Sequence, residues 1–250
     1  MSTYNLYFSP TGGTKKIGNG ITSNIDENFK TIEIEDLVKE RLFNADDLLI
    51  VTMPCFSGRL PEYCAEKLKL LFGNGAKVVI VSAYGNREFD DQLIEMKDIL
   101  LERGFIIIAA GAFIAQHSIT GVQGKGRPDS EDINDFKVFA EEIKEKLELG
   151  TNEDFEIPGN NPYKEVAKSS AVPYGDDRCL FCMACVEGCP VNAITEEDPT
   201  DTDADLCFGC QRCIVVCPVE CRAIDKDMKA AVTKMLSQIA SERKENKWFL

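Results

Sequence analysis

The sequence predicts an α/β protein with a mostly parallel sheet, followed by a small cysteine-rich α+β domain. Over residues 1–149, short apolar segments alternate with amphipathic ones, a pattern typical of a parallel sheet covered by helices on both faces. Nine of the eleven cysteines lie after residue 178, which sets the rest of the chain apart. We therefore expect a sheet domain (1–149), a linker (150–173), a cysteine domain (174–226) and a C-terminal amphipathic helix (227–250).

The elements of the sheet domain follow from the spacing of its apolar residues. Segments 48–53 and 77–82 are nearly continuously apolar, as parallel strands buried on both faces are. The predicted strands are 4–8, 31–34, 47–53, 76–83 and 105–112, and the predicted helices run over roughly 14–28, 61–72, 88–103 and 130–148.

Glycine and proline without a periodic pattern between residues 150 and 175 favour a linker that lies over the surface. Beyond the cysteines, apolar residues recur at helical spacing and predict an amphipathic helix: Met228, Val232, Met235, Leu236 and Ile239. We expect this helix and the tail Trp248–Leu250 to pack back on the protein. A helix that binds a partner is the alternative.

The chain is acidic, with a formal net charge of −14. Binding to nucleic acid or to anionic membranes needs basic surface, so neither is expected as a partner. An acidic surface does suit brief encounters with basic redox proteins, although solubility alone also accounts for it.

The first residues contain no basic stretch before an apolar core, and the longest apolar run, 104–115, is too short to span a bilayer. We therefore expect a cytoplasmic protein. Thiols stay reduced there, so clustered cysteines indicate metal or redox chemistry rather than disulfides.

The cysteines form two runs with the same spacing, CxxCxxCxxxCP. The first run is Cys179, Cys182, Cys185 and Cys189, and the second, 28 residues later, is Cys207, Cys210, Cys213 and Cys217. Zinc sites usually use two separated CxxC pairs, so this spacing favours [4Fe–4S] clusters over zinc. The repeat also predicts approximate two-fold symmetry within the cysteine domain.

Residues 174–226 resemble the bacterial two-cluster ferredoxins, in which the last cysteine of each run binds the other run's cluster. The resemblance implies one [4Fe–4S] cluster on Cys179, Cys182, Cys185 and Cys217, and a second on Cys207, Cys210, Cys213 and Cys189. The second half departs from the first by two extra residues, Cys221 and Arg222. We expect Cys221 to be a spare buried thiol; a ligand or a group that tunes a cluster is the alternative.

A loop rich in hydroxyls and glycines joins the first predicted strand to its helix. Such a loop can bind phosphate through exposed backbone N–H groups and the helix N-terminus. Its pattern, Ser-x-Thr-Gly-x-Thr, resembles the phosphate loop of flavodoxins, which bind FMN, although Gly13 stands where many flavodoxins have asparagine. Two later loops, 53–61 and 83–91, lie where flavodoxins hold the flavin ring.

The resemblance to flavodoxins covers residues 3–148. It implies a doubly wound, five-stranded parallel sheet with strand order 2-1-3-4-5. It also implies a phosphate site and a ring site for FMN. The phosphate residues are Ser9, Thr11, Gly12, Gly13 and Thr14, and the ring residues are Pro54, Phe56, Ser57, Gly58, Tyr84, Gly85, Asn86 and Phe89.

For several residues near these loops, two interpretations remain open. Arg59 and Arg87 either approach the flavin and tune it, or are ordinary surface charges. His117, the single histidine, is a structural residue or an acid–base group in the long loop that runs to residue 129. Cys55 lies inside a ring loop and could touch the flavin, whereas Cys64 is expected in the core.

A flavodoxin-like domain followed by a two-cluster ferredoxin resembles the flavodoxin–ferredoxin fusion family of anaerobic bacteria, the EFR-family ferrodoxins. The resemblance implies electron transfer between FMN and the clusters, with redox proteins as partners. An electron carrier without its own substrate is the favoured interpretation. The alternatives are a flavin-dependent reductase of a small molecule, and a docking module whose sheet domain has lost FMN.

Overall fold

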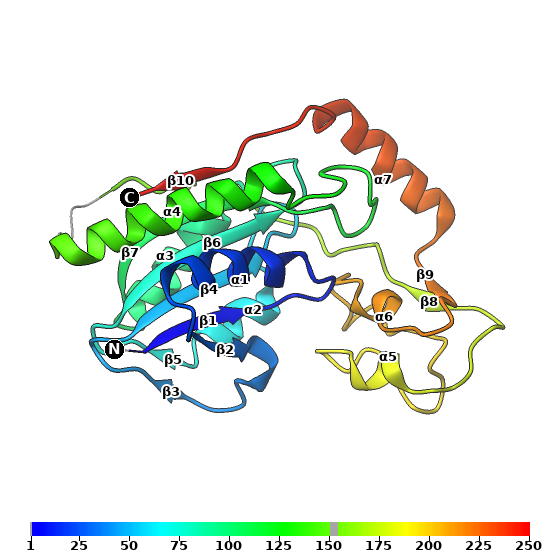
Figure 1. Ribbon diagram of the computed structural model, residues 1–250. Helices are drawn as coiled ribbons and strands as arrows, with labels where there is room; N and C mark the ends of the chain where they lie inside the picture. Colours follow the sequence, from blue (N-terminus) through cyan, green and yellow to red (C-terminus); the bar gives the residue numbers. More distant parts are fainter. Residues whose placement is uncertain (1, 151–154) are drawn as a thin grey trace.

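The computed structural model describes residues 2–150 and 155–250, so linker residues 151–154 lie outside the described residues. A six-stranded sheet forms the centre of the sheet domain (Figure 1). Its strands lie in the order β10-β7-β6-β4-β1-β2. They are β1 (Thr3–Tyr7), β2 (Lys30–Glu33), β4 (Leu48–Pro54), β6 (Lys77–Tyr84), β7 (Ile106–Ile114) and β10 (Lys247–Phe249).

Five of these strands are parallel: β1, β2, β4, β6 and β7. Counted one to five along the chain, they lie in the predicted order 2-1-3-4-5. This is the flavodoxin-like order of doubly wound sheets. The sequence predicted five strands, but the sheet has six, because β10 pairs antiparallel with β7. Three residues at the end of the chain bind the sheet through backbone hydrogen bonds, which no hydrophobic pattern reveals.

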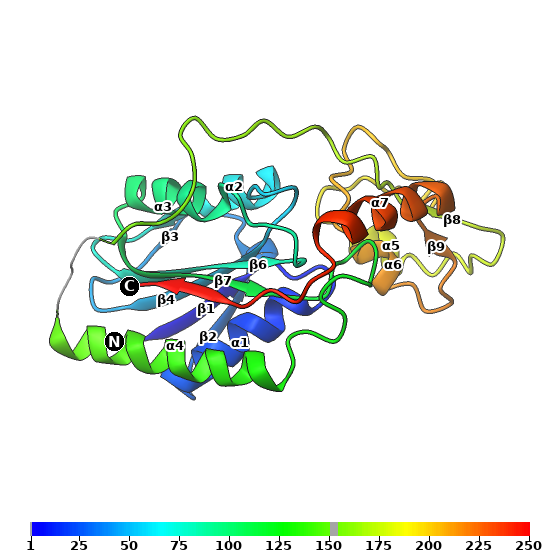
Figure 2. The same ribbon diagram turned by 90° about the horizontal axis from the view of Figure 1, so that it is seen from above.

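Helices cover both faces of the sheet. Helices α1 (Gly13–Ile25) and α4 (Ser130–Leu149) lie on one face, and α2 (Glu62–Leu68) and α3 (Gln92–Glu102) on the other (Figure 2). Successive residues of a strand point to opposite faces. Along β4, Leu48 and Ile50 therefore pack in the core with α1 and α4, whereas Leu49 and Val51 pack in the core on the α2 and α3 side. Two covered faces explain the continuous apolar strands.

Several helices are shorter than predicted. Helix α1 ends at Ile25 rather than at 28, and the predicted C-terminal helix 227–250 ends at Ile239, with Lys247–Phe249 forming β10 instead. Two others are shorter for a local reason. Helix α2 ends at Leu68 because Leu71–Phe72 form β5, which pairs with β3 (Arg41–Leu42). Helix α3 begins at Gln92 because the preceding residues bind the loop after β4, where the Asp91 N–H donates to Gly58 O at 3.0 Å. A 3-10 turn, η1 (Ile34–Asp36), follows β2.

The backbone of the cysteine half repeats with the cysteines. Helices α5 (Ala184–Glu187) and α6 (Arg212–Val215) lie 28 residues apart. Each follows a left-handed residue, Met183 (φ 61°) or Gln211 (φ 67°). The short strands β8 (Tyr174–Gly175) and β9 (Arg222–Ala223) pair antiparallel. The internal repeat predicted from the sequence is therefore present in the backbone.

After the cysteine half, the chain returns to the sheet domain. Helix α7 (Lys226–Ile239) leads back, and β10 then pairs with the edge strand β7 (Figure 1). The Trp248 ring lies parallel to that of Phe113, with centroids 6.2 Å apart, and its Nε1–H donates to Glu142 Oε2 at 2.7 Å. The expectation that the tail packs back is confirmed.

The apolar stripe of α7 is only partly covered. Leu236 is 4% exposed, but Met235 and Ile239 are 52% and 57% exposed. Among the described residues, no helix combines the length and apolar character needed to cross a bilayer.

Candidate functional site

A cavity of about 630 Å³ lies at the carboxyl ends of the parallel strands. Loops that follow β1, β4, β6 and β7 line one part of it, and linker residues 164–171 and α7 line another. Ligands of open parallel sheets bind at this edge, and cofactor sites typically measure about 300–1,000 Å³. The cavity therefore has the place and the size of a cofactor site.

The loop after β1 presents free hydrogen-bond donors to the cavity. Helix α1 begins after Gly12 (φ 88°) and has no side-chain cap. The Lys15 N–H donates to Ser9 Oγ at 2.9 Å. The N–H groups of Gly13 and Thr14 make no hydrogen bond within the described part of the chain. Uncapped N–H groups at a helix N-terminus, together with the helix dipole, favour an anion such as a phosphate.

The loop after β4 is a tight hairpin. Phe56 and Arg59 exchange two backbone hydrogen bonds of 3.0 Å. The residues between them, Ser57 (φ 55°) and Gly58 (φ 87°), both have the positive φ that a type I′ turn requires. Position 58 needs glycine for a second reason, because a Cβ there would lie 1.9 Å from Asp90 Oδ2. The two predicted ring loops thus pack directly against each other.

Asp90 joins these loops to the linker. Its carboxylate accepts hydrogen bonds from Arg87 and, at 2.8 Å, from Lys164 Nζ. Burial opposes the charged form, but these two hydrogen bonds hold the pKa of Asp90 below its ordinary value. Arg87 lines the cavity, yet its guanidinium is already paired with this carboxylate.

Arg59 anchors the linker to the sheet domain. It makes two hydrogen bonds to Glu95, at 2.8 and 2.9 Å, and a third, at 2.5 Å, to Lys164 O. Its guanidinium also lies over the Tyr163 ring, 4.8 Å from the centroid. Arg59 does not line the cavity.

The described part of the linker is held at several further points. The backbone N–H groups of Asn160 and Lys164 donate to Asp91 at 2.8 and 2.7 Å, and Tyr163 OH donates to Asp98 at 2.5 Å. The described part of the linker therefore follows a defined path to the cavity, which its glycines and prolines did not predict.

His117 and Cys55 both line the cavity. His117 Nδ1 accepts hydrogen bonds from the N–H groups of Ile119 (3.3 Å) and Thr120 (3.4 Å), so the neutral ring carries its proton on Nε2. Burial and the charge of Arg87 lower the pKa of His117, which keeps the ring neutral at pH 7. Burial raises the pKa of the Cys55 thiol to about 12, so this group is not a thiolate nucleophile.

The structure brings together most of the residues predicted for FMN. The cavity is lined by Thr11, Gly13, Thr14, Pro54, Phe56, Ser57, Gly58, Tyr84 and Gly85. Ser9, Gly12, Asn86 and Phe89 do not line it. Asn86 Nδ2 donates to the carbonyl oxygens of Ala240 (3.0 Å) and Glu242 (2.8 Å), and Phe89 packs in the core, edge-on to Tyr84.

Other cavity residues were not predicted. They come from the start of the loop after β7, from the linker, from α7 and from the second cysteine run: Ala115, Gln116, Lys164, Lys168, Ala171, Phe208, Met228, Val232 and Leu236. The stripe of α7 was visible in the sequence, but nothing there indicates which surface it faces.

The cysteines gather at two small cavities. The first cysteine site is lined by Cys179, Cys182, Cys185 and Cys217, and the second by Cys189, Cys207, Cys210 and Cys213. Each site thus takes three cysteines from one run and the last cysteine of the other, the grouping that the ferredoxin resemblance implies. Four such thiols fit the ligand set of a cubane cluster, and a fifth cysteine, Cys221, also lines the first site.

Backbone N–H groups point at several of these sulfurs. Phe181 N–H donates to Cys179 Sγ at 3.5 Å, Ala193 N–H to Cys189 Sγ at 3.2 Å, and Gly209 N–H to Cys207 Sγ at 3.4 Å. Hydrogen bonds to the sulfurs reduce their negative charge and help to set the potential of a bound cluster.

Cys221 lies at the first cysteine site. It is buried, its Sγ is 3.4 Å from that of Cys217, and its N–H donates to Cys217 Sγ at 3.3 Å. Burial raises the pKa of Cys221 to about 11, with a further contribution from Cys217. Its neighbour Arg222 is also buried and donates to the carbonyl oxygens of Pro173 and Pro199. The two extra residues are thus packed inside the domain.

Phe208 connects the large cavity with the second cysteine site, because it lines both. Its ring contacts those of Tyr63, Phe8 and Phe56, with centroids 5.9, 6.1 and 6.2 Å apart. Cys210 is 9% exposed and belongs to the core of the sheet domain.

An ion pair supports the same contact. Arg212 pairs with Glu35 of the sheet domain, and its guanidinium lies 5.2 Å from the Phe8 ring centroid. The second cysteine site is therefore packed against the sheet domain, beside the large cavity.

One family model matches a part of the chain that includes the first cysteine run. Residues 172–195 match the family described as "4Fe-4S binding domain". No curated protein matches the chain.

Several similar solved structures are flavodoxins. They include Flavodoxin 2 of Bacillus cereus (20% identity, 58% of this chain and 99% of that one, TM-score 0.44). A Streptococcus pneumoniae TIGR4 flavodoxin (19%, 58% and 99%, 0.41) and a flavodoxin from the domain Archaea (17%, 59% and 99%, 0.43) are others. The assignment of the fold rests on the strand order of the sheet itself.

The chain thus joins a flavodoxin-like sheet domain to an iron–sulfur segment of the ferredoxin type. Such segments hold [4Fe–4S] clusters through cysteine thiolates and carry out electron transfer.

Proposed function

We propose that the chain binds FMN in the large cavity and a [4Fe–4S] cluster at each cysteine site, and that it transfers electrons between them. Flavin exchanges electrons in pairs or singly and a cubane exchanges one at a time, so the combination converts between the two kinds of chemistry. The observation that carries the proposal is the position of Phe208, which borders both the cavity and the second cysteine site.

The residues present fit an FMN. The N–H groups of Gly13 and Thr14 at the uncapped end of α1 are suited to its phosphate. The hairpin at Phe56–Arg59 and the loop at Tyr84–Gly85 border the rest of the cavity, where the ring would lie. The neutral Nε2–H of His117 is a further donor there for a carbonyl oxygen or a ring nitrogen.

Two clusters fit the cysteine sites. The family match covers the first run, and the second run repeats its spacing and its backbone. Since the second site packs on the sheet domain, we place its cluster next to FMN in the order of transfer and the cluster of the first site beyond it.

The elements around the cavity favour an electron carrier over a reductase. Linker residues 164–171, the apolar stripe of α7 and Phe208 of the second cysteine run line part of it, so that part faces the cysteine half of the chain rather than a separate substrate. Its free hydrogen-bond donors support a domain that keeps its FMN rather than a docking module without cofactor.

The test begins with anaerobic purification or reconstitution of the full chain, with iron, sulfide and flavin measured per chain. We expect about eight irons and one FMN. A protein that takes up iron but no flavin would reject the FMN proposal, and about four irons would reject the second cluster.

The route is tested by replacing Phe208 with alanine and following electron transfer from photoreduced flavin to the clusters. Leu180 occupies the equivalent position of the first run, so Leu180→Ala is the matched control. We expect slower transfer in Phe208→Ala alone, at unchanged iron and flavin content. Equal rates in the two variants would contradict the proposed order.

A further inference from the structure

The two cysteine loops are equivalent by the internal repeat, but their surroundings differ. Position 180 corresponds to 208 and position 182 to 210, each 28 residues apart. Phe208 is packed on the sheet domain and Cys210 is buried, whereas Leu180 is 66% exposed and Cys182 is exposed. The same structural element is thus covered in one half and open in the other.

The covered loop shows how this element makes a contact. The apolar side chain next to the first cysteine, Phe208, inserts among three aromatic rings of the sheet domain. A charged residue two positions after Cys210, Arg212, adds an ion pair with Glu35 beside them. Apolar insertion surrounded by ionic contacts is the usual anatomy of a docking interface.

The open loop presents the same kind of surface. Leu180 and Phe181 (58% exposed) stand next to each other between Cys179 and Cys182, which line the first cysteine site. Phe181 is held at φ 52°, which matches Gly209 (φ 73°) of the covered loop. Two neighbouring large apolar side chains in water, at the edge of a redox site, indicate a surface that a partner covers.

The charge around this loop defines the partner. Residues 174–226 contain eleven Asp and Glu but four Lys and Arg. Of the four cations, Arg212 pairs with Glu35, Arg222 is buried and Arg178 pairs with Asp176 at 2.7 Å. Asp177 and Glu187, on either side of the loop, are both exposed.

We propose that Leu180 and Phe181, with the acidic residues around them, form the docking surface for a redox protein that presents an apolar depression within a basic rim. The partner exchanges single electrons with the cluster of the first cysteine site. This proposal rests on the proposed function, since it assigns the far cluster as the exit or entry of the route. In the outward direction, the cluster loses one electron and the partner gains it, with no bond made or broken.

Binding and electron transfer are tested separately with one probe, cytochrome c, a basic haem protein that accepts single electrons. The zinc-porphyrin form of the probe does not exchange electrons in the dark, so it reports docking alone. The test variant is Leu180→Ser/Phe181→Ser in the reconstituted full chain. The control is Leu42→Ser, in β3 of the sheet domain, where the leucine is 72% exposed.

We expect the double variant to raise the Kd for the zinc probe by about tenfold. We also expect that, after dithionite has reduced the clusters, the double variant reduces the haem of the probe about tenfold more slowly. Leu42→Ser should stay within about twofold. Asp177→Lys/Glu187→Lys should weaken the salt dependence of the rate, because opposite charges steer the encounter. Iron content and reduction of ferricyanide, which needs no docking surface, should be the same in all variants.

Equal Kd values in the double variant and in Leu42→Ser would overturn the proposal. It would also be overturned if sedimentation showed that the wild type self-associates through these residues, because a second copy would then be the occupant. If the reconstituted wild-type chain failed to reduce even ferricyanide, the proposed electron transfer would be rejected, but the binding result would stay valid. The two ideas can therefore fail separately.

Discussion

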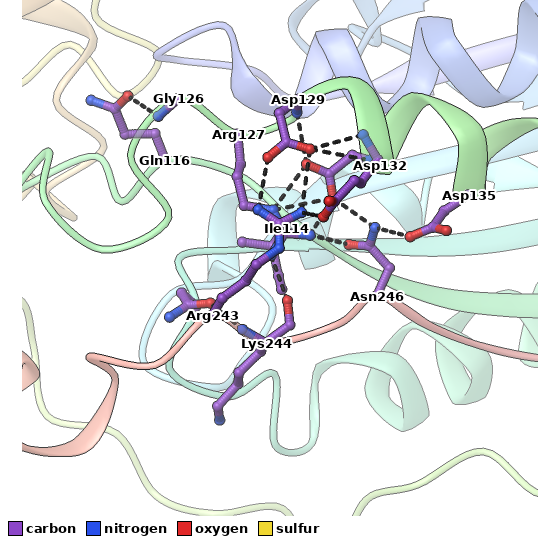
Figure 3. A network of polar contacts seen from close by, with 12 residues as sticks. Ile114, Gln116, Gly126, Arg127, Asp129, Asp132, Asp135, Arg243, Lys244 and Asn246 are labelled. Carbon is purple, nitrogen blue, oxygen red and sulfur yellow. Dashed lines mark hydrogen bonds and ion pairs between the residues drawn. The ribbon is translucent and has the colours of Figure 1, made fainter.

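Replacement of Arg127 by glutamine tests the network that holds the C-terminal segment on the sheet domain (Figure 3). Arg127 and Asp132 form an ion pair with side chains 3% and 0% exposed. Arg127 Nε donates to Asp132 Oδ2 at 2.9 Å, and its NH1 group donates to Lys244 O at 2.5 Å. The variant leaves the Asp132 carboxylate buried without a cation.

The structure indicates the size of the effect. Breaking a buried ion pair by removing one partner lowers the free energy of unfolding by about 3–5 kcal/mol. Asp132 would keep two neutral donors, the Asp129 N–H and Asn246 Nδ2, both at 2.7 Å. We therefore expect the lower end, about 3 kcal/mol, which corresponds to a fall of about 6–12 °C in Tm for a chain of this size.

Arg243 provides the matched control in the same network. It pairs with Asp129 at 2.7 Å and with Glu131, but its side chain is 39% exposed and those partners are 36% and 73% exposed. Because solvent screens an exposed ion pair, Arg243→Gln should lower stability much less than Arg127→Gln.

The assay is reversible urea unfolding of the sheet domain, followed by the fluorescence of Trp248, the single tryptophan. Arg127→Gln should unfold at clearly lower urea than both the wild type and Arg243→Gln. If the two variants fall within about 0.5 kcal/mol of each other, burial does not decide the strength of this network and the reasoning is wrong.

Three further predictions concern the cavity and the tail. Gly58→Ala should lower stability by about 2 kcal/mol or more and weaken FMN binding in a fluorescence titration, because the new Cβ meets the Asp90 carboxylate. The control is Gly126→Ala (φ 81°), which has open space around its Cβ and should show only the strain of positive φ. Equal losses of stability in the two variants would refute this prediction. The lowered pKa of His117 means that the unfolded chain binds more protons below the ordinary value of 6.5, so stability should fall as the pH drops from 7 through 6.5. Urea unfolding at pH 7 and 5.5 should show a smaller loss in His117→Gln than in the wild type, and an equal loss would exclude His117 as the cause. Trp248→Ala should lower stability by about 3 kcal/mol through its contacts with Phe113 and Glu142, measured by circular dichroism; a loss below about 1 kcal/mol would mean that β10 does not stabilise the sheet.

Position in a loop did not determine which side chains line the cavity. Four residues at the end of β6 and in the loop after it were predicted at the flavin ring: Tyr84, Gly85, Asn86 and Phe89. Yet Asn86, at φ 64°, turns its amide to the chain that follows α7. Phe89 points into the core with Tyr84. The orientation of each side chain depends on backbone dihedral angles and on segments more than 150 residues away, which the local sequence does not encode.

The sequence by itself determined the features that depend on local spacing. The parallel character of the sheet follows from alternating strands and helices, and the approximate two-fold repeat of the cysteine half follows from two equal runs. The strand order 2-1-3-4-5 came from the resemblance to flavodoxins. The choice of [4Fe–4S] chemistry follows from cysteine spacing, because a short loop can surround a cluster only with a given number of residues between its ligands. Each of these patterns can be read from residues that lie near one another in the sequence, although each cysteine site also takes one cysteine from the other run.

Tertiary structure alone decided what each repeated element faces. Leu180 and Phe208 occupy equivalent positions, but the sheet domain covers only Phe208. The stripe of α7 borders the large cavity, and β10 completes the edge of the sheet. The hydrophobic effect is non-directional, so an apolar pattern in the sequence shows which side chains prefer to be covered but not what covers them. Contacts between distant parts of the chain determine what covers them.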